Sequence, residues 1–272
     1  MKLTSFFQGT LLLVFLAACS GLSPAPTPTV TPVLDTSTPT ATIVWFPPTN
    51  TPSPFPAQTI VPTPDQHPGL GELLFSDSFD QPDLWSTSAS AGASAAITLN
   101  RLVLSISGSG PISILSLRSQ PVLGDFYAEA VVKLSLCGGK NQFGMIFRAS
   151  PGEDYYRLAV SCDGQARIER IRSGSNTPLL DWSSSGDMPT AAPAEVKIGV
   201  WAVANEMRFF LNEHLQFSVR DPVLHNGTLG FFAYANGAEP ITVSFSDLVV
   251  YSVTYTSPTP SLTPSRTPTP TP

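Results

Sequence analysis

The carboxylates of this 272-residue chain are the first residues to test for catalysis, because enzymes that cleave glycosidic bonds hold two of them close together. The dipeptide Glu153-Asp154 lies in a predicted turn, where neighbouring side chains diverge. Glu206 and Glu213 stand at the two ends of a predicted hairpin, and Asp181 and Asp187 lie in a predicted loop. The pattern favours solvated surface charges, although carboxylates from distant loops can still converge.

Nucleophilic and metal-based chemistry has less support. Of the three histidines, His67 lies in a proline-rich stretch, and His214 and His225 flank a predicted strand. No serine stands in a Gly-x-Ser-x-Gly turn, the setting of the nucleophile in many hydrolases. The spacing of histidines and cysteines does not match a zinc site. The sequence therefore predicts neither a catalytic triad nor a metal held by histidine or cysteine.

Aromatic and amide side chains offer a different chemistry, the recognition of sugars. Aromatic rings stack on the apolar faces of sugar rings, while polar side chains bind the hydroxyls. The candidate ligand-binding residues are Tyr155, Tyr156, Arg157, Trp182, Trp201, Tyr234 and Asn236. Each aromatic residue has an alternative role in packing a core or the edge of a sheet.

Strand alternation sorts some of these candidates by face. Successive side chains of a strand point to opposite sides, so one of Tyr155 and Tyr156 faces outward, and Arg157 shares the face of Tyr155. Trp201 has the same parity as Lys197 and therefore lies on the more polar face of its predicted strand.

Cys137 and Cys162 form a candidate disulfide, since an even pair in an exported domain commonly pairs. The bond would close a loop of about 25 residues and stabilise the fold by roughly 3 kcal/mol. In a plain meander, however, the two residues lie two strands apart, about 10 Å, whereas a disulfide requires Cα atoms within about 7 Å. A disulfide and two separate thiols therefore both remain open.

The elements that must position these residues are β-strands. Apolar residues alternate over residues 125–136, which is typical of a half-buried strand. The predicted strands are residues 72–79, 95–99, 101–107, 112–117, 125–136, 142–149, 154–161, 165–172, 195–203, 206–211, 214–219, 228–235 and 241–253. Residues 173–194, which include Trp182, are predicted to be a polar loop. This pattern predicts an all-β, two-sheet antiparallel sandwich spanning residues 69–256.

Several segments carry a family resemblance. They are Leu74-Phe75-Ser76-Asp77-Ser78-Phe79, the strands at 143–148 and 155–160, Phe209-Phe210-Leu211-Asn212-Glu213, Gly227-Thr228-Leu229-Gly230-Phe231 and Val243-Ser244-Phe245-Ser246-Asp247-Leu248-Val249-Val250. Together they resemble the concanavalin A-like (laminin G-like) jelly rolls, especially the 3-keto-disaccharide hydrolase-type domain. The resemblance covers roughly residues 72–255. It implies the fold more than the function, because lectins, hydrolases and adhesion modules share this sandwich.

The same resemblance has implications for catalysis and for metal binding. Glycosidases of this fold carry a Glu-x-Asp-x-x-Glu strand, which is absent here, so the sequence favours a domain that is not an enzyme. Jelly rolls of this kind often hold a structural calcium ion, for which Asp77 and Asp247 are the candidate ligands. Both can instead be edge-strand charges that discourage pairing between sheets. No other cofactor is expected.

The N-terminus has the pattern of an export signal. Lys2 precedes an apolar run at residues 11–16 that is too short to span a membrane. The sequence Leu16-Ala17-Ala18-Cys19 resembles the lipobox of bacterial lipoproteins, which implies cleavage after residue 18 and lipidation of Cys19. The alternative is an ordinary secretory signal. The expected location is the outer face of the cell membrane, extracellular or periplasmic, with the lipid as anchor.

Two Pro/Thr-rich arms flank the sandwich. Of the 28 prolines, 13 lie within residues 24–68 and six within residues 257–272. Such segments bury too little apolar surface to fold, so residues 19–68 and 257–272 are predicted to be disordered.

Charge is sparse, at 12% of residues with a formal net charge of −6, which argues against nucleic acid as a partner. The basic residues Lys133, Arg148, Arg157, Arg167, Arg170 and Arg172 are spaced along strands and read as a solvated sheet face. The sequence is best interpreted as a lipoprotein whose sandwich binds a carbohydrate or envelope ligand without catalysis. The alternatives are a hydrolase of the 3-keto-disaccharide type and a structural or protein-adhesion module.

Overall fold

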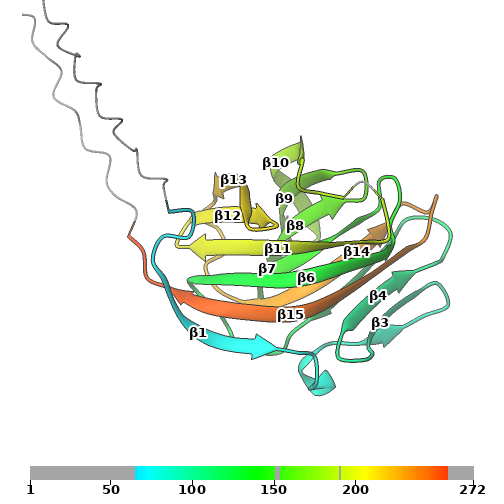
Figure 1. The fold of residues 1–272 in the computed structure, drawn as a ribbon, viewed down its shortest axis with the longest axis horizontal. Helices are drawn as coiled ribbons and strands as arrows, with labels where there is room; N and C mark the ends of the chain where they lie inside the picture. The colour runs from blue at the N-terminus through cyan, green and yellow to red at the C-terminus, as the bar shows by residue number, and fades with distance from the viewer. Residues whose placement is uncertain (1–64, 151–153, 190, 257–272) are drawn as a thin grey trace, which may run out of the picture. The chain divides into compact units, whose positions relative to one another are not determined.

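The computed structural model describes residues 65–150, 154–189 and 191–256, which form an antiparallel β-sandwich of two sheets (Figure 1). In these ranges the helical structure is limited to one 3-10 turn, Pro82–Leu84. No helix in this part of the chain has the length and hydrophobicity needed to cross a membrane. The predicted all-β sandwich is confirmed. The predicted signal, Cys19, the arm up to residue 64 and the C-terminal arm lie outside the described residues.

One sheet has nine strands. Its order is β13-β12-β11-β6-β15-β4-β3-β2, and β1 pairs with β15 beside this path. The strands are β1 (Leu70–Asp77), β2 (Ser88–Ala89), β3 (Ala93–Ile97), β4 (Leu102–Ile106), β6 (Phe126–Leu136), β11 (Ala194–Val203), β12 (Glu206–Leu211), β13 (His214–Arg220) and β15 (Ile241–Val253). In Figure 1, β11, β6 and β15 run through the front of the molecule.

The second sheet has six strands and lies behind the first in Figure 1. Its order is β10-β9-β8-β7-β14-β5. The strands are β5 (Ile112–Leu117), β7 (Gln142–Ser150), β8 (Asp154–Ser161), β9 (Gln165–Arg172), β10 (Ser175–Ser184) and β14 (Thr228–Ala235).

The core lies between the sheets and follows from the alternation of apolar residues. On β6, Phe126, Ala128, Ala130, Val132 and Leu134 are all buried in one cluster. Aromatic rings from the two sheets meet across this layer, as Phe231 of β14 stacks on Phe245 of β15 with ring centroids 4.2 Å apart. Burial of such large side chains is the main source of stability for a sandwich of this size.

The prediction of a polar loop at residues 173–194 is partly wrong, because residues 175–184 form β10 at the edge of the six-stranded sheet. The strand is mostly exposed and includes Pro178, which an edge strand tolerates because one side needs no hydrogen bonds. An edge strand with little burial has no apolar alternation, so the sequence lacked the usual strand signal.

Cys137 and Cys162 form a disulfide with a Cα–Cα distance of 5.4 Å. The meander geometry that separated them does not apply, because β6 and β8 belong to different sheets. Cys137 follows β6 and Cys162 follows β8, so the bond joins the two sheets at one end of the sandwich.

Candidate functional site

The outer face of the six-stranded sheet carries a second apolar cluster, separate from the core. Its buried members are Ile146, Ala149, Ala159 and Phe232, and Leu117, Tyr155, Trp182 and Tyr234 pack against them half-buried. Their neighbours in sequence, such as Phe147, Tyr156, Leu158 and Phe231, belong to the core instead. Strand alternation thus divides each of these strands between an inner and an outer face. We call the outer one the aromatic face.

A buried carboxylate lies among the residues of the aromatic face. Glu169 of β9 is fully buried, and it accepts hydrogen bonds from Arg157 Nε at 2.7 Å and from Asn176 Nδ2 at 2.8 Å. Arg167 forms a further ion pair with the same carboxylate. Arg157 and Glu169 are directly opposite each other on β8 and β9, so strand register brings this pair together.

Each of the two guanidinium groups also lies over an aromatic ring. Arg157 is 4.7 Å from the centroid of Phe232, and Arg167 is 4.4 Å from the centroid of Trp182. A cation over a ring is attracted by the negative charge of the ring face. The two arginines are therefore held between the Glu169 carboxylate and an aromatic ring, which limits their rotamers.

The two central strands carry small residues on this face. In strand register Phe232 lies beside Gly144, Gly144 beside Ala159, and Ala159 beside Arg167. A Cβ on Gly144 would come within 1.9 Å of the Leu158 carbonyl oxygen, so glycine is required there. This row across the sheet thus has large side chains on both sides of two small ones.

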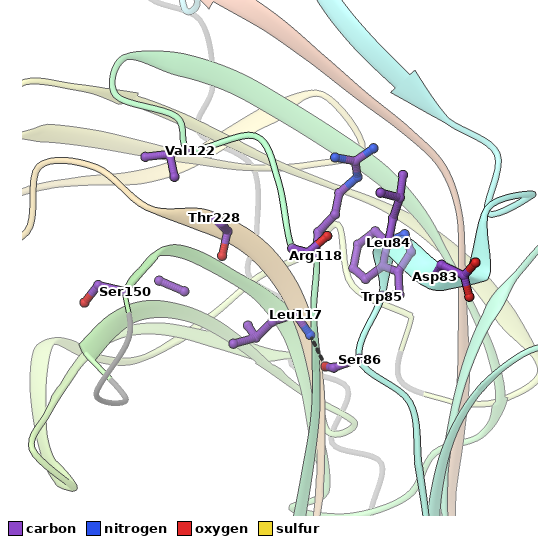
Figure 2. Close-up of a pocket in the computed structure, with 11 residues that line it drawn as sticks. Asp83, Leu84, Trp85, Ser86, Leu117, Arg118, Val122, Ser150 and Thr228 are labelled. Atoms are coloured by element: carbon purple, nitrogen blue, oxygen red, sulfur yellow. Dashed lines mark hydrogen bonds between the residues drawn. The ribbon is translucent and has the colours of Figure 1, made fainter.

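A pocket of about 560 Å³ adjoins the aromatic face at β5. It is lined by Asp83, Leu84, Trp85, Ser86, Leu117, Arg118, Ser119, Val122, Ala149, Ser150 and Thr228. Figure 2 shows Leu117 in the middle, with Trp85 on one side and Ser150 and Thr228 on the other. The backbone N–H of Leu117 donates to Ser86 Oγ at 2.8 Å. Leu117 and Ala149 belong both to this pocket and to the aromatic face.

Four of the residues predicted from the sequence to bind a ligand lie together on the aromatic face: Tyr155, Arg157, Trp182 and Tyr234. Asn236 lies in the loop after β14, where its side chain accepts a hydrogen bond from the N–H of Ala238. It shapes that loop and is not a member of the cluster.

Tyr156 was a candidate ligand-binding residue, and this prediction is wrong because its ring is fully buried in the core. Its hydroxyl donates to Asp221 Oδ1 at 2.6 Å and accepts from the N–H of Leu224 at 3.1 Å. Burial, together with the hydrogen bond to Asp221, raises the pKa of Tyr156 to about 12. Tyr155 is therefore the outward member of the pair.

Trp201 also fails as an exposed binding residue. It lies on the outer side of the nine-stranded sheet, outside the main core, yet it is fully buried because the chain before β1 crosses it. Its Nε1 donates to the Pro68 carbonyl at 3.2 Å, and Tyr255 and Arg208 pack on its ring at 5.5 Å and 4.8 Å. His67 stacks on the neighbouring Phe210 at 4.1 Å. The packed domain therefore includes residues that the sequence analysis assigned to the linker ending at 68.

The predicted calcium site does not fit the structure. Asp77 is buried, and its carboxylate accepts from the Phe79 N–H at 2.8 Å, Trp85 Nε1 at 3.1 Å and Arg118 Nε at 2.8 Å. The Arg118 guanidinium supplies the positive charge that a cation would bring. Asp247 is exposed, and the described residues contain no group of three or more acidic, histidine or cysteine side chains able to hold a metal.

The ligand-binding residues predicted from the sequence did not include Arg167, Glu169, Asn176 or Phe232. The alternation in QARIERIR places Arg167 and Glu169 on one face, which is a signal for this pair, but charged residues on a strand are also typical of a solvated surface. Arg148 departs most from that interpretation, because it is fully buried and donates to the Ala204 and Leu224 carbonyls at 2.8 Å and 2.9 Å.

Comparison with known proteins identifies the fold class. No protein-family model and no curated protein sequence matches the chain. Among solved structures, the carbohydrate-binding module CBM66 from Bacillus subtilis is 16% identical with a TM-score of 0.50, over 62% of this chain and 96% of that one. A Bacillus subtilis protein of unknown function with a galectin-like fold is 13% identical with a TM-score of 0.51, over 67% and 97%. A native glycosidic hydrolase is 11% identical with a TM-score of 0.50, over 65% and 94%.

At these identities the likeness concerns the fold alone. The domain has a concanavalin A-like jelly-roll fold, as the sequence resemblance predicted. That fold serves both binding and catalysis, so the function has to be argued from the aromatic face itself.

Proposed function

We propose that this domain binds a carbohydrate on the aromatic face of its six-stranded sheet, without cleaving it. The observation that carries the proposal is that Tyr155, Trp182 and Tyr234 lie half-buried on the same outer face of the sheet as the Arg157–Glu169 pair. A solved protein of this fold is a carbohydrate-binding module. Rings of this kind offer flat apolar surfaces to a sugar, and the guanidinium groups offer N–H donors to its oxygens.

The positions and partners of the carboxylates on this sheet favour binding over hydrolysis. In the described strands of this sheet, the carboxylates other than Glu169 are Asp154, at the start of β8, and Asp181, exposed on the edge strand β10. Glu169 is buried and paired with two arginines, whereas a glycosidase needs a second carboxyl group close to the first.

A glycan array probed with the purified full-length protein tests the proposal. Trp182→Ala should weaken binding to the best glycan about tenfold, equivalent to ~1.4 kcal/mol. The matched control is Tyr251→Ala, a half-exposed aromatic of the other sheet, which should leave the affinity unchanged. No binding to any glycan, or equal loss in both variants, would contradict the assignment of this face.

We also propose that Cys19 anchors the chain to a membrane through lipid and that the Pro/Thr-rich chain between Cys19 and residue 65 acts as a spacer. The support is the signal and lipobox pattern in the sequence, together with the composition of the arm. The Cys19→Ala variant should move from the membrane fraction to the soluble fraction or the medium. An unchanged membrane association would contradict lipid anchoring.

A further inference from the structure

The charge on the aromatic face is unequal in sign and in exposure. The Glu169 side chain is 0% exposed, whereas the side chains of Arg157 and Arg167 are 14% and 18% exposed. The negative charge is thus covered and the two positive charges reach the surface. A ligand approaching this face meets guanidinium groups before it meets the carboxylate.

The pairing around Glu169 leaves both positive charge and donor capacity in excess. Two guanidiniums supply far more N–H donors than one carboxylate can accept, and Asn176 already uses part of that carboxylate. The Nε of Arg167 is buried without a hydrogen-bond partner. An additional acceptor with negative charge would balance the cluster.

The other charged side chains of these strands have partners outside the Glu169 cluster. Arg148 is buried among backbone carbonyls, and Arg170 pairs with Asp221 on the core side. Arg172 lies 3.8 Å from Asp154 near the strand ends. Asp181 is exposed on the edge strand, and its carboxylate accepts a hydrogen bond from the N–H of Trp182. The net positive charge is therefore local to the Arg157–Glu169–Arg167 cluster, in a chain whose formal charge is −6.

From this arrangement we infer that the saccharide bound on the aromatic face carries a carboxylate, which Arg157 and Arg167 recognise beside the Trp182 ring. The inference rests on the proposed function and specifies its ligand class. Guanidinium groups bind carboxylates through paired, charge-assisted hydrogen bonds, and a fixed guanidinium loses little entropy on binding. The neighbouring ring of Trp182 supplies the stacking surface for the sugar.

The test compares each acid with its own neutral derivative by calorimetry on the full-length protein. The two carboxylated probes are an oligogalacturonate and a peptidoglycan disaccharide with a free muramyl carboxylate, each paired with its methyl ester. A neutral cello-oligosaccharide completes the set. At least one acid should bind ten or more times tighter than its ester, and the advantage should shrink between 50 and 500 mM salt because screening weakens charge pairing.

Each outcome decides between the two proposals. Equal affinity for the acids and esters, or a preference for the neutral oligosaccharide, overturns the carboxylate inference and leaves carbohydrate binding intact. No affinity for any of these five saccharides overturns the carboxylate inference, and the glycan array then decides the proposed function. Binding of one acid but not the other supports the inference and identifies the source of the carboxylate.

A variant removes the charges without leaving one unpaired. In the triple variant R157Q/R167Q/E169Q all three side chains become neutral and keep hydrogen-bonding groups. It should bind acid and ester equally while retaining weak affinity for the sugar. The control is Asp181→Asn, which changes a nearby charge outside the cluster and should keep the preference for the acid. A triple variant that still prefers the acid tenfold would overturn the role of the arginines, and the wild-type comparison is decisive if this variant does not fold.

Discussion

Removal of the Cys137–Cys162 disulfide should destabilise the sandwich by about 3.5 kcal/mol. The bond closes a loop with a sequence separation of 25 residues, and the chain-entropy relation converts this length into that free energy at 25 °C. A change of 1 kcal/mol shifts the melting temperature of a domain of this size by about 2–4 °C. The double variant C137A/C162A should therefore melt about 7–14 °C below the wild type.

The assay is thermal unfolding followed by circular dichroism, supported by urea titration. Wild-type protein treated with a reductant should approach the melting temperature of the double variant, which separates loss of the cross-link from loss of the sulfur atoms. Reductant should leave the double variant unchanged. Intact-mass measurement after alkylation without reductant should leave Cys137 and Cys162 unmodified in the wild type.

Two results would refute this reasoning. Alkylation of both cysteines in unreduced protein would mean that the bond is not formed. A double variant that melts within 2 °C of the wild type would mean that the link between the sheets does not restrict the unfolded chain as the loop length requires.

Three further substitutions test the site and the packing around it. Glu169→Gln should lower the free energy of unfolding, measured with urea, by about 3 kcal/mol, because it leaves two half-buried guanidiniums without a carboxylate between them. Stability should return only when one of the two arginines is replaced as well. Tyr156→Phe should cost about 1–2 kcal/mol, since it removes a buried hydroxyl with two partners; an unchanged urea midpoint would contradict this. Burial lowers the pKa of His67 from its ordinary value of 6.5, so its contribution to stability is present above that value and is lost as the pH falls. The melting temperature should therefore fall more between pH 7.5 and 5.0 in the wild type than in His67→Phe, and equal slopes would contradict it.

Much of the aromatic face could be predicted from the sequence. Strand parity alone placed Arg157 with Tyr155, and the candidate residues included Trp182 and Tyr234. Parity also places Arg167 and Glu169 together, but nothing in the sequence indicates that β8 and β9 align Arg157 opposite Glu169 or that the carboxylate is buried. From sequence alone, a charged residue on a strand is predicted to be solvated unless its partners on neighbouring strands are known.

The errors about burial share one physical cause, which is contact between segments distant in the chain. The sequence placed Trp201 on the outer side of its strand, but it could not show that Pro68, more than 130 residues earlier, covers the ring. The sequence likewise predicts that Tyr155 and Tyr156 point to opposite faces, but it does not decide which of the two lies in the core. Local periodicity specifies faces, and burial depends on what packs against each face.

By itself the sequence determined the fold class, the alternation of its strands and the composition of its arms, because these depend on residues a few positions apart. Only the tertiary structure decided that β6 and β8 lie in different sheets, which brings Cys137 and Cys162 within bonding distance. Only the register of β8, β9 and β10 gathers two arginines and an asparagine around Glu169. Sheet membership and register arise from pairing over long separations, and that pairing is chosen by the packing of the whole core.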